Sequence, residues 1–140
     1  MRLNRAASQA ARANGVRAAT DITGFGLIGH ASEMTGAGRV RFRIRFEALP
    51  WLPGAWQYGE EWTFAGGAFN NHAFYNSLVT YTRPVTDWQQ MLLHDPQTSG
   101  GLLLALPNER EESYLRFCAE LEQSAWVIGD VVEGEGIEIV

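Results

Sequence analysis

The segment RVRFRIRF at residues 39–46 constrains the fold more than any other part of this chain. Arginine and apolar side chains alternate strictly along it, and successive side chains of a β-strand point to opposite faces. The alternation therefore predicts a strand that buries its apolar side chains and turns its arginines the other way. We interpret the arginines as an ordinary solvated face with glutamates nearby, as in half-buried antiparallel strands. The alternative is a basic face that meets a phosphate or a partner domain.

Helical and strand patterns alternate along the rest of the chain. We expect helices over residues 2–14, 24–34, 87–93 and from 107 onward, and strands over 16–20, 100–106, 125–132 and 136–140. Asp87 is expected to cap its helix, and the continuous apolar run 100–106 predicts a central strand buried on both faces. Residues 54–82 are the least regular segment. Interleaved helices and strands with one buried strand indicate a single layered α/β or α+β domain over residues 1–140.

Composition narrows the classes of function. Apolar residues make up 46% and charged residues 19%, which argues against disorder. The net charge of −5 argues against non-specific binding of nucleic acid through a basic surface. No apolar run approaches the ~20 residues that span a bilayer, and the single cysteine permits no internal disulfide, in agreement with a reducing cytoplasm. All eleven basic residues are arginine, so this chain supplies no lysine for Schiff-base or phosphate chemistry.

Two further segments combine hydroxyls, a carboxylate and glycines in a tight turn beside an apolar run. They are TDITGFGLIGH at residues 20–30 and DPQTSGGLL at residues 95–103. Glycines let the backbone approach a ligand closely, and hydroxyls with N–H groups suit phosphate oxygens. A carboxylate in the same turn suits Mg²⁺, which binds through oxygen and often shares its shell with phosphates. We expect the two turns to lie close together on one exposed rim.

Together the two segments resemble the C-terminal half of the selenophosphate synthetase (selenide, water dikinase) family. The resemblance runs along nearly the whole chain and includes ALPWLPGA at residues 48–55. The wider superfamily includes aminoimidazole ribonucleotide synthetase and thiamine-monophosphate kinase, and residues 95–101 narrow the choice to selenophosphate synthetase. The resemblance implies an α+β fold with a mixed β-sheet covered by helices. The family's N-terminal half, with its reactive cysteine or selenocysteine, essential lysine and most of the ATP site, has no counterpart in this chain.

The resemblance also implies roles for single residues. Asp21 is expected to be a ligand of Mg²⁺ bound with ATP, although an aspartate before a helix is also a common cap. The residues expected to contact the cofactor are Thr23, Gly24, Gly26, Thr98, Ser99, Gly100 and Gly101. Their alternative role is to shape the turns, with side-chain oxygens satisfying the backbone. Both cofactors, Mg²⁺ and ATP, are expected to be bound mainly by the missing N-terminal half.

Three other positions complete the site expectations. His30 is expected to be a core or capping residue, and the three histidines are not spaced like a zinc site. Cys118 lies on the apolar stripe of a helix and is expected to be buried and unreactive. Asn71 matches the family, whereas residues 65–69 depart from its usual pattern.

The implied function is that of the C-terminal domain of a cytoplasmic enzyme. In the complete family enzyme, ATP and selenide give selenophosphate, orthophosphate and AMP. The expected partners are the N-terminal domain of the same protein and a second copy in a homodimer, with neither nucleic acid nor a membrane. Alone, the chain is expected to be inactive. The alternative is a stand-alone binding or interaction module that kept the fold without catalysis.

Overall fold

The computed structural model describes residues 4–36 and 39–140. Its helices are α1 (Arg5–Ala13), α2 (Gly26–Thr35), α3 (Ala55–Glu60), α4 (Gly66–Tyr75), α5 (Asp87–His94) and α6 (Asn108–Glu120). Its strands are β1 (Ala18–Asp21), β2 (Val40–Ile44), β3 (Val79–Tyr81), β4 (Leu102–Ala105), β5 (Gly129–Glu133) and β6 (Ile137–Ile139), and the 3₁₀ turns are η1 (Phe46–Ala48) and η2 (Asn76–Leu78). Helices packed with a mixed sheet confirm the predicted α+β class. No helix in the described ranges combines the length and apolarity needed to cross a membrane.

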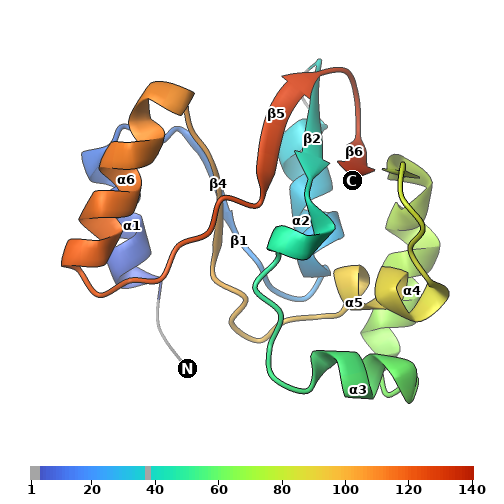
Figure 1. Cartoon of the computed structure of the whole chain (residues 1–140). Coiled ribbons are helices and arrows are strands. Elements are labelled where there is room, and N and C mark those ends of the chain that lie inside the picture. Colours follow the sequence, from blue (N-terminus) through green and yellow to red (C-terminus); the bar gives the residue numbers. More distant parts are fainter. Residues whose placement is uncertain (1–3, 37–38) are drawn as a thin grey trace.

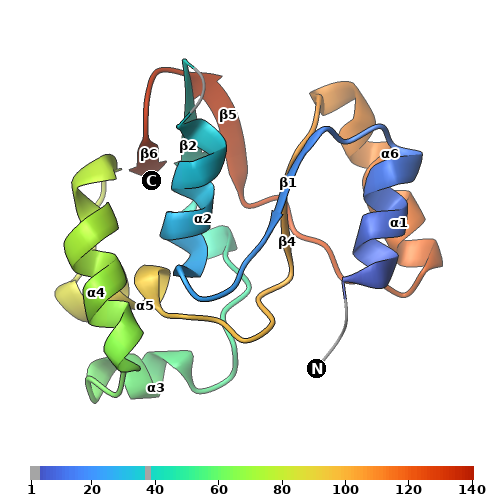
Figure 2. The same ribbon diagram turned by 180° about the vertical axis from the view of Figure 1, so that it is seen from behind.

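The chain forms two packed groups of elements joined by a ribbon of two strands, β1 and β4 (Figure 1). On one side of the ribbon, α1 and α6 lie against each other and bury Ala10, Ala11, Tyr114 and Cys118. On the other side, α2 packs across one face of a four-stranded sheet, and α3, α4 and α5 lie farther from the ribbon (Figure 2). Cys118 is 1% exposed, so the prediction of a buried cysteine is confirmed.

β2 is a central strand of the four-stranded sheet, whose order is β3-β6-β2-β5. It pairs antiparallel with β5 and parallel with β6. Phe42 and Ile44 of β2 are buried in one cluster with Ile28 of α2. This confirms the apolar face that the alternation predicts. The strand is not purely antiparallel, because residues 134–136 carry the chain across the end of β2 and place β6 on its other side.

The opposite face of β2 is solvated and carries ion pairs. Arg43 Nε lies 2.8 Å from Glu138 Oε2. Arg45 Nη1 lies 2.8 Å from Asp130 Oδ2. Solvent screens such exposed pairs, so they hold the arginines in place and add little to stability. The interpretation of this face as an ordinary solvated one with acidic residues nearby is therefore confirmed.

The apolar run 100–106 does not form a central strand, so that prediction is wrong. In the described chain β4 pairs with β1 alone, antiparallel, as the two-stranded ribbon. Its side chains alternate between the two packed groups. Leu103 belongs to the core of the four-stranded sheet, whereas Leu104 packs with the α1–α6 pair. The run is apolar at every position because each face of the ribbon covers a different core.

Residues 54–82 are more regular than the sequence predicts, since they form α3, α4, η2 and β3. Aromatic rings from several elements pack around them. The ring centroids of Trp51 and Trp56 are 5.4 Å apart, and those of Trp56 and Trp88 are 5.3 Å apart. A Cβ on Gly59 would lie 2.7 Å from the Trp88 ring. Packing between rings of different elements leaves no clear helical period in the sequence, which explains why the pattern missed these helices.

Helix α5 is capped by Thr86, not by Asp87 as predicted. Thr86 and Gln89 form a capping box, in which the Thr86 N–H donates to Gln89 Oε1 at 2.9 Å. Asp87 is instead the first helical residue, where its charge still favours the helix N-terminus. The cap matters for the site because the other end of α5, at His94, leads into the second glycine-rich segment.

Candidate functional site

Pairing of β1 with β4 brings the two glycine-rich segments together. In the antiparallel register Asp21, which ends β1, lies opposite Leu102, which begins β4. The turn that follows β1 and the loop that precedes β4 therefore leave the ribbon at the same end. The backbone hydrogen bonds that join them run from Ile22 N to Gly101 O (2.9 Å), from Gly100 N to Ile22 O (3.0 Å) and from Gln97 N to Thr23 O (3.0 Å).

We call residues 20–26 and 95–101 together the rim. Several of its residues are exposed, namely Asp21, Gly24, Phe25, Thr98, Ser99 and Gly100. Thr23 and Gly101 are half-buried, and Gly26 is buried. The prediction that the two turns lie close together on an exposed rim is confirmed.

Gly26 and Gly100 are needed for the shape of the rim. Gly26 has a φ of +68°, and a Cβ there would lie 2.8 Å from the carbonyl carbon of His94. A Cβ on Gly100 would lie 2.8 Å from the carbonyl oxygen of Ile22. The N–H group of Gly26 donates to the carbonyl oxygen of Thr23, and that of Gly100 to the carbonyl oxygen of Ile22. These contacts favour the turn-shaping role for both glycines.

Asp21 stands at the end of β1 with its side chain exposed. The N-cap of α2 is Phe25, without a side-chain cap, so the alternative of a helix cap at Asp21 is wrong. Asp21 lines an open hollow of about 590 Å³ between α1 and β1, with Arg5, Arg12 and Thr20. No three His, Cys, Asp or Glu residues in the described ranges gather closely enough to hold a metal. Mg²⁺ is commonly bound through one or two carboxylates with phosphates and waters, so Asp21 fits one ligand of a shared site.

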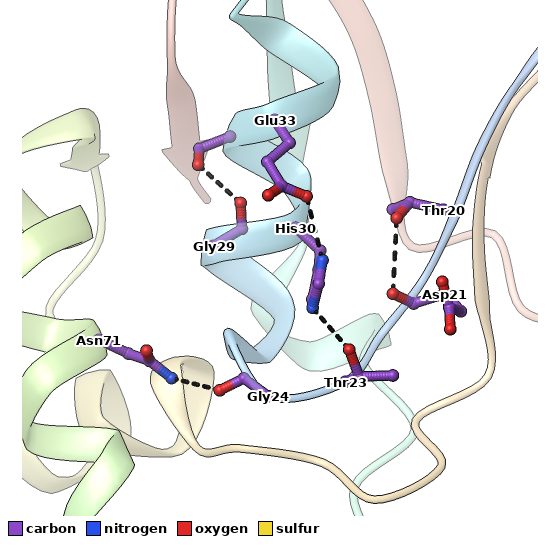
Figure 3. Close-up of polar contacts among 9 residues, drawn as sticks. Thr20, Asp21, Thr23, Gly24, Gly29, His30, Glu33 and Asn71 are labelled. Carbon is purple, nitrogen blue, oxygen red and sulfur yellow. Dashed lines mark hydrogen bonds and ion pairs between the residues drawn. The ribbon is translucent and has the colours of Figure 1, made fainter.

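A chain of side-chain hydrogen bonds lies behind the first turn (Figure 3). Thr23 Oγ1 lies 3.1 Å from His30 Nε2, and His30 Nδ1 lies 3.2 Å from Glu33 Oε2. His30 is 7% exposed, which confirms the prediction of a core residue. The sequence contains a signal for the contact between His30 and Glu33, because these residues are three apart on one helix. The contact with Thr23 depends on the turn and was missed.

Asn71 of α4 fastens the first turn to α5. Its buried amide donates from Nδ2 to the carbonyl oxygen of Gly24 at 2.9 Å and to that of His94 at 3.0 Å. Figure 3 shows the first of these contacts. The sequence identifies Asn71 as a family match but gives it no role, because its partners lie 47 and 23 residues away.

Asp95 is held within the second segment. Gln97 Nε2 donates to Asp95 Oδ2 at 3.2 Å. Burial raises the pKa of Asp95, and hydrogen bonds from the Ala65 backbone and from Gln97 oppose that rise without cancelling it. These contacts favour the structured-turn interpretation for Asp95, while Thr98 and Ser99 remain exposed on the rim.

Comparison with known proteins identifies the family. Residues 1–140 match the family described as AIR synthase related protein, C-terminal domain, and the chain belongs to it. A solved structure of thiamine-monophosphate kinase from Stenotrophomonas maltophilia superposes with a TM-score of 0.56 and 12% identity. That likeness covers 89% of this chain and 31% of the other, and it concerns the fold alone.

Within this family the chain is similar to selenide, water dikinases. The enzyme of Pseudomonas aeruginosa is 39% identical over 98% of this chain. That of Paraburkholderia xenovorans is 39% identical over 99% of the chain, and that of Escherichia coli K12 is 43% identical over 96%. The predicted resemblance to the C-terminal domain of selenophosphate synthetase is therefore confirmed. The chain spans 38–40% of the length of these relatives.

Replacing Asn71 with aspartate is expected to destabilise the fold. A carboxylate keeps the size of the amide but donates nothing, so it would face two carbonyl oxygens left without their donor. Each unsatisfied buried group costs about 1–3 kcal/mol, so Asn71→Asp should lower the free energy of unfolding by roughly 3 kcal/mol. Urea denaturation measures this loss, with Asn70→Asp on the exposed face of the same helix as the control. Equal stability of the two variants would refute the fastening role.

His94 is expected to make stability depend on pH. His94 is 0% exposed, and its Nδ1 donates to the Gln90 carbonyl at 2.8 Å. Its Nε2 has no hydrogen-bond partner in the described chain. Burial, with a smaller effect of His72, lowers the pKa of His94 from 6.5 to about 4. Between these values the unfolded chain binds a proton that the folded chain does not, so the free energy of unfolding falls as the pH falls.

From pH 7 to pH 5, His94 should account for a loss on the order of 2 kcal/mol in the free energy of unfolding. Urea denaturation at the two pH values measures the total change. In His94→Phe the change should be smaller by that amount, whatever the variant's stability at pH 7. An unchanged pH dependence in the variant would contradict a neutral, buried His94.

Proposed function

We propose that this chain is the C-terminal domain of a selenide, water dikinase, which makes selenophosphate from selenide and ATP with release of orthophosphate and AMP. The identity to enzymes of that name extends over nearly the whole chain. The observation that carries the proposal is the rim itself. Two segments separated in sequence meet there through backbone hydrogen bonds, beside one exposed carboxylate.

In this proposal Asp21 supplies one ligand to Mg²⁺ at the nucleotide. When bound there, Mg²⁺ would supply positive charge that offsets the charge of the phosphates, and Asp21 would help to hold it. Thr23, Gly24, Thr98, Ser99 and Gly101 line the Mg²⁺–nucleotide, and Gly26 and Gly100 hold the backbone of the rim in shape. The rim thus forms one wall of a cleft whose other wall belongs to the N-terminal half.

The N-terminal half provides the remaining chemistry in this proposal. This chain contains no lysine, and its one cysteine is buried between α1 and α6. The nucleophile-handling cysteine or selenocysteine, the lysine and most of the ATP site therefore come from the other half. A homodimer of the complete protein and a cytoplasmic location remain predictions from the family resemblance.

The isolated chain is expected to lack dikinase activity. Incubated with ATP, Mg²⁺ and selenide, it should form no more AMP than a protein-free blank, because a rim without its opposite wall cannot position the phosphates. Activity should arise when the chain is joined to the N-terminal part of a selenide, water dikinase. Selenide-stimulated AMP formation by the isolated chain would refute the division of roles. A joined protein that folds but never forms AMP would favour a stand-alone binding module.

Replacing Asp21 with asparagine separates the metal role from a structural one. Asn keeps the shape and an acceptor oxygen, so the melting temperature of the completed enzyme should stay nearly unchanged. The site loses a full negative charge beside a hard cation, so selenophosphate formation should fall by about 100-fold or more. The control is Asp87→Asn, an exposed aspartate at the start of α5. Full activity of Asp21→Asn at limiting Mg²⁺ would contradict the metal role.

A further inference from the structure

The hydrogen bonds among Thr23, His30 and Glu33 have a direction, which follows from what each group can donate. The carboxylate of Glu33 only accepts, so Nδ1 of His30 carries a proton. A neutral imidazole has a single N–H group, which leaves Nε2 as a bare acceptor. In the neutral ring Nε2 therefore accepts the O–H of Thr23, and the Thr23 oxygen keeps its lone pairs for any further partner.

Thr23 follows Asp21 by two residues in the first turn. Asp21 is exposed, Ile22 is buried and Thr23 is half-buried, which is the alternation of an extended chain with Asp21 and Thr23 toward the same side. The carbonyl oxygen of Thr23 also accepts the N–H groups of Gly26 and Gln97, each at 3.0 Å. Both the backbone and the hydroxyl of Thr23 are thus fixed from within the chain.

The packing around His30 keeps its ring in one orientation. The Phe25 ring lies against it, with centroids 5.3 Å apart. Phe25 can lie there because Gly29 has no side chain, since a Cβ at Gly29 would overlap the Cβ of Phe25 and come within 3.0 Å of the Tyr75 ring. A 180° flip of the ring would put Cδ2 and Cε1 in the places of Nδ1 and Nε2 and would lose both hydrogen bonds, so Nε2 stays on Thr23.

We propose that His30, held by Glu33, is a positioning residue that turns the lone pairs of the Thr23 hydroxyl, and not its hydrogen, toward the candidate site. The inference rests on the proposed function and narrows it. A hydroxyl that presents lone pairs suits a donor, such as a water molecule bound to Mg²⁺. A phosphate oxygen only accepts, so it must be met by other groups of the rim.

Two substitutions of His30 test the positioning role. The amide of glutamine reaches the place of Nε2, whereas the amide of asparagine reaches only that of Nδ1. His30→Gln can therefore keep the contact with Thr23, and His30→Asn keeps the contact with Glu33 alone. Calorimetry on the completed enzyme would measure binding of Mg²⁺ with a non-hydrolysable ATP analogue. We expect His30→Asn to weaken binding about tenfold and His30→Gln to stay within about threefold of the unmodified protein.

Thr23 supplies a second pair of variants that leaves the His30 packing untouched. Thr23→Val keeps the shape and loses the hydroxyl, so it should weaken binding about as much as His30→Asn. Thr23→Ser keeps the hydroxyl, so it should retain most of the binding that Thr23→Val loses. Equal effects of Val and Ser, or of Asn and Gln at position 30, would show a merely structural role and overturn the inference. Failure of the unmodified completed enzyme to bind the analogue would overturn the proposed function as well.

A spectroscopic measurement on the chain itself separates these two failures. In ¹⁵N-labelled protein, the imidazole nitrogens of His30 should show a protonated Nδ1 and a bare Nε2. Thr23→Val should move the Nε2 resonance and leave Nδ1 nearly in place. A proton on Nε2 in the neutral ring would overturn the positioning inference, even if the completed enzyme proves to be an active dikinase.

Discussion

The antiparallel pairing of β1 with β4 is the constraint on which the rest of this molecule depends. Its register places Asp21 opposite Leu102, so the turn after one strand and the loop before the other emerge together. Strand β4 also faces both packed groups, with Leu103 in one core and Leu104 in the other. A shift of one residue would exchange these side chains between the cores and separate the halves of the rim. Stability and site geometry therefore rest on one register.

The sequence predicts what local chemistry determines. Alternation along residues 39–46 identifies β2 because the period of a strand is a property of neighbouring residues. The same principle misleads at residues 100–106, where an unbroken apolar run has two explanations. A strand inside a sheet is apolar on both faces, and so is a ribbon between two cores. Only the positions of α1 and α6 decide between them, and those are tertiary information.

The site shows the same division. The sequence supplies the residue types of both turns, and the family resemblance brings them together. It does not show which glycines serve the backbone and which face outward. A side chain at Gly26 would collide with the carbonyl group of His94. A side chain at Gly29 would collide with Phe25 and the Tyr75 ring. The sequence gives Asn71 no role for the same reason, because the carbonyl groups to which its amide donates are brought to it only by the fold.

Hydrogen bonds within the chain hold the rim, and this bears on what it can contribute to the proposed site. Three sets of hydrogen bonds hold the rim in place. They are the backbone bonds between its two turns, the bonds of the Asn71 amide, and the side-chain bonds of His30. One carboxylate on such a surface binds Mg²⁺ weakly, because the cation gives up hydration reluctantly and needs several oxygen ligands. A preorganised wall loses little conformational freedom when a second wall closes on it, so in the proposed enzyme this rim would contribute most within a shared cleft. In the proposed enzyme, the hydrogen bonds that hold this rim would set the shape of the shared site, and the strength of binding would depend on the ligands that the N-terminal half adds.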